Sequence, residues 1–153
     1  MLRRARQLSA NETKDLTQLE SIWYEGEVRN HEHYNWTRYY ALNLHSVFYK
    51  GTVEFRCFNS TLHAGRAAAY INLCLAMSAQ AISQRSTVMR KTQSDNELFT
   101  FRVWLVRLGL NGPEFKNTRD HLLANLSGDR AWRYDKDSYE VNKKKKKNRG
   151  TER

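Results

Sequence analysis

The sequence predicts an α+β domain in which an antiparallel β-hairpin, at about residues 39–45 and 52–58, is packed by a long helix at about 65–84 and by two to three further helices. Two observations support this fold class. Apolar and polar residues alternate in the two short segments, as they do in strands with one buried face. Apolar residues then recur at helical spacing over about twenty positions. Because a two-stranded hairpin is marginal alone, the long helix is expected to cover it.

The first helix is expected between residues 13 and 25, where leucines and Ile22 recur at helical spacing. Gly26 follows at the position where helices commonly end. Residues 29–36 are polar and aromatic without a clear period, which predicts a loop.

The two strands follow this loop, and Lys50-Gly51 predicts a turn within a connection of about six residues. Asn43 falls on the polar face of the first strand. In the second strand, Glu54 and Arg56 share the polar face, opposite an apolar face made of Val53, Phe55 and Cys57.

The long helix from Gly65 to Gln84 is expected to bury one stripe of residues, namely Ala67, Tyr70, Ile71, Cys74, Leu75, Ser78 and Ile82. Cys57 and Cys74 would both lie on apolar faces. We therefore interpret them as small buried hydrophobic residues and not as nucleophiles.

Two more helices are predicted before the C-terminal tail. Ser94 and Glu97 have the spacing of a capping box, and the helix behind them would end at Gly109. Gly112-Pro113 then predicts the start of a helix that runs to Gly128, because proline is tolerated in a first turn.

The net charge of +10 is concentrated at the two ends of the chain. Residues 143–153 carry +6, and Arg3, Arg4 and Arg6 carry +3, which leaves +1 for residues 7–142. The sequence therefore predicts a basic arm at residues 1–10, a single nearly neutral domain at 11–142 and a disordered lysine-rich tail at 143–153. Nucleic acid would bind only nonspecifically, through the tail.

No apolar run approaches 18 residues, so no membrane partner is expected. The basic N-terminus leads into polar residues and does not resemble a secretory signal. Two cysteines are too few for a disulfide framework. Together these features predict a cytoplasmic protein.

Glu54 and Arg56 are the most informative candidates for chemistry. Residues two apart on a strand leave the same face about 7 Å apart, so a carboxylate and a guanidinium could hold a divalent metal and a phosphate oxygen side by side. The other reading is a salt bridge on a solvated face, which the spacing alone favours. Asn43 can lie near both residues if the register of the strands allows.

Three sequence elements in series carry a resemblance to a known family. They are Leu42-Asn43-Leu44, Thr52-Val53-Glu54-Phe55-Arg56 and Asn59-Ser60-Thr61-Leu62-His63-Ala64-Gly65, the last of which opens the long helix. Over about residues 20–140 the chain resembles the C-terminal half of the putative amidoligase family, whose catalytic fold is similar to glutamine synthetase and glutamate-cysteine ligase. The resemblance implies a partial glutamine-synthetase-like fold and a bacterial setting.

The resemblance also implies an ATP-dependent ligase that joins a carboxylate to an amine through an acyl phosphate. The substrates would be small molecules or peptides, and magnesium and ATP would be the cofactors. Carried over to this chain, Glu54 would be a metal ligand and Arg56 a contact to the phosphate, both catalytic, while Arg38 and Asn43 would contact the nucleotide or the substrate.

The chain departs from the family pattern in one respect. The N-terminal half of family members bears paired glutamates in a Glu-x-Glu strand, whereas Glu25-Gly26-Glu27 sits at a predicted helix end. His31-Glu32-His33 could substitute as a metal site, although a polar surface loop is the favoured interpretation. We therefore expect a truncated gene product, a chain with a misassigned start or one part of a split enzyme, and in each case a chain that is inactive or incomplete alone. It would associate with a complementing N-terminal half or with itself.

Two alternatives remain open at this stage. The chain could be a noncatalytic basic binding module whose termini contact nucleic acid, or an assembly partner that completes the sheet of another chain. His45 and His63 flank the Glu54 strand and are further candidates for a site.

Overall fold

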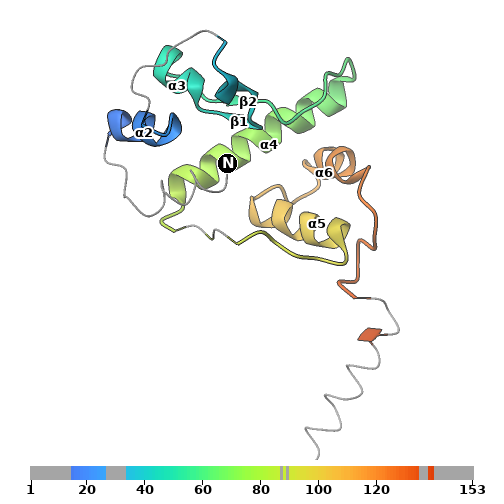
Figure 1. Cartoon of the computed structure of the whole chain (residues 1–153). Coiled ribbons are helices and arrows are strands. Elements are labelled where there is room, and N and C mark those ends of the chain that lie inside the picture. The colour runs from blue at the N-terminus through green and yellow to red at the C-terminus, as the bar shows by residue number, and fades with distance from the viewer. Residues whose placement is uncertain (1–14, 27–33, 87, 89, 135–137, 140–153) are drawn as a thin grey trace, which may run out of the picture. The chain divides into compact units, whose positions relative to one another are not determined.

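The computed structural model describes residues 15–26, 34–86, 88, 90–134 and 138–139 (Figure 1). The chain divides into two compact units, residues 1–60 with 84–91 and residues 61–83 with 92–153. The described residues form five α-helices, one 3-10 helix and a two-stranded antiparallel sheet, which confirms the α+β class. Both predicted basic ends, at residues 1–10 and 143–153, lie outside the described residues. The single domain at 11–142 stays a prediction.

The first unit contains, in chain order, α2 (Leu16–Trp23), the 3-10 helix η1 (Trp36–Tyr39), β1 (Leu42–Asn43), α3 (His45–Lys50) and β2 (Glu54–Phe55). The predicted first helix is confirmed as α2. The Asp15 side chain caps it by accepting the backbone N–H of Gln18 at 2.7 Å. The chain leaves α2 through Gly26, whose φ of +92° suits glycine.

Trp23, at the end of α2, is part of the buried core of the first unit and is 3% exposed. Its indole N–H donates to the Thr37 hydroxyl at 3.0 Å, and that hydroxyl donates to the Asn35 side chain at 2.7 Å. The Tyr40 ring meets the Trp23 ring edge to face, with 5.5 Å between centroids. These contacts join α2 to η1, which directly precedes β1.

The predicted hairpin forms, but its strands are much shorter than expected. Only Leu42–Asn43 and Glu54–Phe55 pair, and the connection contains the helix α3 instead of a simple turn. Asn43 explains this difference, because its side-chain oxygen accepts the backbone N–H of His45 at 2.9 Å. That N–H therefore does not donate to the opposite strand, and the chain turns into α3. The placement of His45 in a strand was therefore wrong.

The apolar face predicted for the second strand is also wrong in part. Val53 is 52% exposed, and Cys57 is exposed, whereas Phe55 is half-buried. Strand pairing ends at Phe55, so the alternation beyond it places no side chain in a sheet. Cys57 is thus not the buried hydrophobic residue that we expected.

The second unit contains α4 (Ala64–Ser83), α5 (Glu97–Arg107) and α6 (Lys116–Leu123). The long helix is confirmed as α4. Its predicted stripe is wrong at three positions, since Ile71, Leu75 and Ile82 are 59%, 63% and 88% exposed. The contact expected between this helix and the hairpin would join the two units, and it stays a prediction.

The buried face of α4 follows from its contact with α6. The buried residues of α4 are Ala69 and Leu73. The Asn72 amide donates to the Thr118 hydroxyl of α6 at 2.9 Å. At Gly65 an added Cβ would lie 2.6 Å from Nε2 of His121 on α6, so a larger residue would require the imidazole to move.

The start of α5 differs from the predicted capping box. Asn96, not Ser94, is the N-cap, and its side-chain oxygen accepts the backbone N–H of Phe99 at 3.0 Å. Its amide nitrogen donates to the carbonyls of Asp129 at 3.1 Å and Trp132 at 2.7 Å. One side chain thereby fastens the segment after α6 to the start of α5.

The end of α5 agrees with the sequence, and the start of α6 does not. Gly109, with φ of +87°, follows α5 as predicted. Pro113 lies in a turn ahead of α6, which begins only at Lys116. Among the residues that the structure describes, no helix is both long and apolar enough to span a bilayer.

Candidate functional site

The strand register brings two of the predicted site residues together. Asn43 of β1 lies directly opposite Glu54 of β2, and side chains at paired positions leave the same face of a sheet. The Asn43 amide nitrogen donates to Oε2 of Glu54 at 2.6 Å. The expectation that Asn43 lies near Glu54 is confirmed.

Asn43 is 2% exposed, and both the nitrogen and the oxygen of its side-chain amide are hydrogen-bonded to neighbouring residues. The nitrogen donates to Ser46 at 3.0 Å as well as to Glu54, while the oxygen accepts from the His45 backbone. Both amide hydrogens therefore have acceptors within the protein. This arrangement fixes the Glu54 carboxylate rather than offering Asn43 to a ligand.

Glu54 and Arg56 form an ion pair on one side of the strand. Nη1 of Arg56 lies 3.8 Å from Oε2 of Glu54, and the two side chains are 28% and 49% exposed. The same Nη1 atom is buried and has no hydrogen-bond partner among the described residues. A buried guanidinium nitrogen normally has an acceptor, and here the Glu54 carboxylate lies at ion-pair distance without making a hydrogen bond to it.

Tyr39, the last residue of η1, is contacted by both Arg56 and Arg38. The guanidinium carbon of Arg56 lies 5.3 Å from the centroid of the Tyr39 ring, and that of Arg38 lies 5.8 Å from it. Arg38 also lies 5.4 Å from the ring centroid of Tyr34. Both distances to Tyr39 are typical of cation–π contacts. All four predicted site residues thus gather at one position of the first unit.

Sequence reasoning missed Tyr39 as part of this cluster. The ring is 67% exposed, although it contacts two arginines. Its position next to Arg38 in the sequence could have indicated it. Its contact with Arg56, however, joins residues seventeen positions apart and depends on the fold.

A second hydrogen bond extends the polar network away from Glu54. His45 is 5% exposed, and its Nδ1 lies 2.5 Å from the hydroxyl of Tyr24. Burial raises the pKa of Tyr24 to about 12, and the Glu20 carboxylate contributes further. His45 was expected to flank a site, and here it links α2 to the Asn43 position. Tyr24 carried no signal in the sequence, because it reaches His45 only through folding.

His63, the other histidine that we considered, belongs to the second unit. Its ring meets that of His121, with centroids 4.9 Å apart. His31-Glu32-His33 and Glu27 lie outside the described residues.

The cluster contains few ligands for a metal. Glu54 supplies one carboxylate, and the described residues contain no group of three or more histidine, cysteine or acidic side chains that could hold an ion. Two cavities, one between α5 and the α6 region and one beside α6, are lined by residues of the second unit. What the cluster offers is one fixed carboxylate paired with the Arg56 guanidinium, and Arg38 contacts the same Tyr39 ring as Arg56.

Comparison with known proteins adds one finding. A family model described as putative amidoligase enzyme matches residues 1–78. This range includes the cluster formed by Arg38, Asn43, Glu54 and Arg56, and it begins and ends earlier than the range of about 20–140 that we expected. No curated protein and no solved structure matches the chain.

Proposed function

Because the chain belongs to the family of putative amidoligase enzymes, we propose that it supplies an ATP-binding site for a carboxylate–amine ligase. In such a reaction a carboxylate takes the γ-phosphoryl group of ATP, and an amine then displaces phosphate to form an amide bond. The chemistry requires a group that neutralises phosphate charge and a cation near the transferring phosphoryl group.

The observation that carries this proposal is the pairing of Glu54 with Arg56. A carboxylate and a guanidinium stand 3.8 Å apart on one strand, and Asn43 holds the carboxylate through a 2.6 Å hydrogen bond. On a plain solvated surface, an ion pair of this kind would need no buried amide behind it. The fixed carboxylate is what a binding site requires.

Arg56 fits the phosphate role. Its side chain is 28% exposed, and a guanidinium binds phosphate oxygens through parallel N–H donors in a planar fork. The stacking of Arg56 on Tyr39 limits the rotation of the guanidinium, so less entropy is lost when phosphate binds. Arg38, which contacts the same ring, would make a second contact to the nucleotide.

Glu54 fits a magnesium ion that is shared with the nucleotide. Magnesium in nucleotide sites is commonly held by one or two carboxylates together with phosphate oxygens and water. Oε1 of Glu54 makes no hydrogen bond within the described part of the chain, so it is available to an ion. The ion would supply neutralisation of phosphate charge. Asn43 would act as a positioning residue for Glu54.

Isothermal titration of the full chain with magnesium and ATP tests the proposal. We expect wild-type binding that weakens about tenfold or more in Glu54→Gln, because a charge-assisted contact contributes about 1.5–3 kcal/mol. Arg56→Lys should also weaken binding, since lysine lacks the planar fork. Glu114→Gln is the matched control, because it removes an exposed carboxylate in the second unit.

The absence of heat at millimolar nucleotide, or equal affinity in wild type and Glu54→Gln, would refute the assignment. The noncatalytic alternative makes the opposite prediction. It requires nucleic-acid binding that disappears when residues 143–153 are deleted and that is indifferent to Glu54→Gln. The family match does not favour this alternative.

A further inference from the structure

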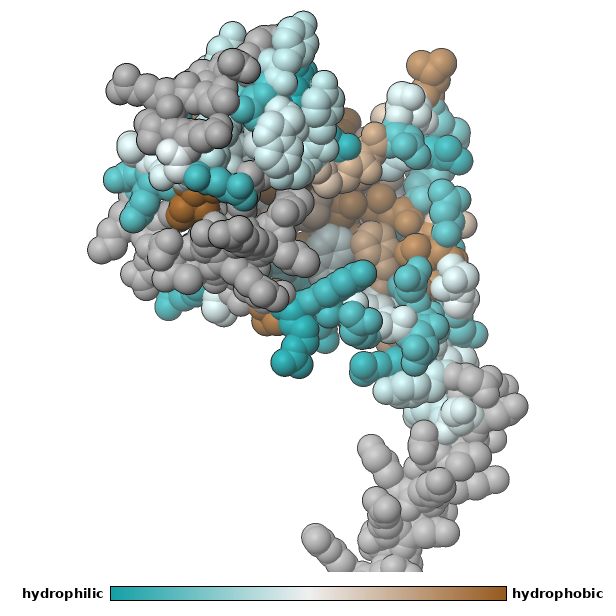
Figure 2. Space-filling model, in the orientation of Figure 1, coloured by the Kyte–Doolittle hydropathy of each residue, from teal (hydrophilic) through white to brown (hydrophobic). Residues whose placement is uncertain are grey.

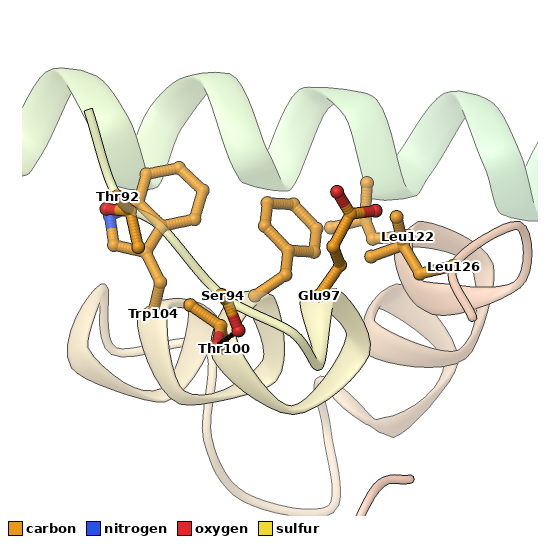
Figure 3. A pocket seen from close by; sticks show the side chains of 8 residues that line it. Thr92, Ser94, Glu97, Thr100, Trp104, Leu122 and Leu126 are labelled. Atoms are coloured by element: carbon orange, nitrogen blue, oxygen red, sulfur yellow. Dashed lines mark hydrogen bonds between the residues drawn. The ribbon is translucent and has the colours of Figure 1, made fainter. Parts of the chain in front are cut away.

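The second unit contains a cavity that the proposed function does not use. It measures about 620 Å³, and its lining comes from α5, α6 and the segment that leads into α5. Figure 3 shows Glu97 and Trp104 extending from the same side of α5 toward α4. A cavity of this size is within the range of small-molecule sites.

The walls of the cavity are largely apolar. Phe101 and Trp104 lie with ring centroids 5.4 Å apart and planes inclined by 31°, and Leu122 and Leu126 of the α6 region line the cavity as well. Figure 2 shows apolar side chains gathered on the visible face over α5 and α6. Such walls favour a ligand with an aromatic or aliphatic body.

The Glu97 carboxylate adds one negative charge to the lining of the cavity. If the predicted capping box had formed, this carboxylate would bond back to the chain at Ser94. Asn96 is the N-cap instead, so Glu97 is the first residue of α5 and its carboxylate is released from that role. Within the described part of the chain, no hydrogen bond or ion pair engages the Glu97 side chain.

We propose that this cavity binds an organic ammonium ion with an aromatic or branched aliphatic body. The ammonium group pairs with the Glu97 carboxylate, and the body fills the space between the aromatic rings and the leucines. The faces of Phe101 and Trp104 also attract a cation, which adds to the preference for a charged ligand. The inference is independent of the proposed function, because Glu54 and Arg56 belong to the other unit.

The test compares three probes on the full chain by isothermal titration without nucleotide. 2-Phenylethylamine has both the cation and the apolar body, 2-phenylethanol lacks the charge, and ethylamine lacks the aromatic body. We expect phenylethylamine to bind about tenfold more tightly than either of the other two, because a charge-assisted contact and ring burial each contribute.

Variants then assign the site. Glu97→Gln should reduce phenylethylamine affinity about tenfold and remove its advantage over phenylethanol, and Trp104→Leu should weaken both aromatic probes. Glu114→Gln removes another exposed carboxylate of the same unit and should change nothing. Thermal unfolding of each variant confirms that it is folded.

Equal affinity for the amine and the alcohol would overturn the proposal, as would an unchanged affinity in Glu97→Gln. Failure of phenylethylamine to bind at millimolar concentration would also overturn it. None of these outcomes depends on magnesium or ATP, so the two proposals fail separately.

Discussion

Replacing Asn43 by alanine should destabilise the first unit and release Glu54. The amide makes three hydrogen bonds, which run to Glu54, Ser46 and the backbone N–H of His45. Asn43→Ala removes all three and introduces no larger group. The buried His45 N–H then has neither its acceptor nor easy access to water.

The cost can be worked out from the exposure of each partner. A buried donor left without an acceptor costs about 1–3 kcal/mol. Ser46 and Glu54 are not fully buried, so water can replace the lost bonds, and these two together should cost about 1 kcal/mol. We therefore expect Asn43→Ala to lower the free energy of unfolding by about 2–4 kcal/mol.

Urea unfolding followed by tryptophan fluorescence measures this loss, because Trp23 is buried in the same unit. Asn59→Ala is the matched control, since Asn59 is exposed and should change stability by less than about 0.5 kcal/mol. A loss below about 1 kcal/mol in Asn43→Ala would refute the reasoning.

Asn43→Asp gives an independent check of the same site. It keeps the acceptor for His45 but sets a second carboxylate against Glu54. Two carboxylates this close raise each other's pKa, so the variant should be less destabilised at pH 4 than at pH 7. An equal loss at both pH values would contradict this contact.

The remaining predictions concern Tyr24 and Gly128. Because the pKa of Tyr24 is about 12 in the folded chain and about 10 unfolded, its contribution to the free energy of unfolding should fall by about 2–3 kcal/mol between pH 10 and pH 12 and be constant below that window. Tyr24→Phe should abolish this fall in urea unfolding measured across the range. Gly128→Ala should cost about 2–3 kcal/mol, because φ is +122° and the added Cβ would collide with the Asn96 side chain. Gly109→Ala, with φ of +87° and open space, should cost only about 1 kcal/mol in the same assay.

The gross fold and the centre of the cluster could be predicted from the sequence because they depend on local patterns. Helical periodicity placed α4 to within a residue at each end. Alternation placed Asn43 and Glu54 on strands, and the register then set them opposite each other. The contact of Tyr39 with Arg56 could not be predicted in this way, because it joins separate elements.

Local competition between hydrogen bonds explains the main errors in the structure predicted from the sequence. The alternation over residues 39–45 is typical of a strand, but the side chain of Asn43 accepts the His45 N–H and starts α3 instead. At the start of α5, Ser94 and Asn96 are both suitable caps, and the structure uses Asn96. In α4 the buried face is set by the contact with α6, which pattern alone does not reveal.

The asparagine at position 96 has a consequence for how this fold would appear in a genetic experiment. Its oxygen and both of its amide hydrogens are matched to backbone groups at Phe99, Asp129 and Trp132. Aspartate would set a second carboxylate oxygen against the carbonyls of residues 129 and 132, where asparagine has its N–H groups. Serine is too short and has only one hydroxyl hydrogen to donate. A library randomised at this codon and selected for folded protein should return asparagine. Because its partners are main-chain atoms, the contact itself requires no particular side chain at 129 or 132, and this long-range link would leave no trace of coupled substitution. Asp129 is constrained separately, since its carboxylate accepts the backbone N–H groups of Ala131 and Trp132.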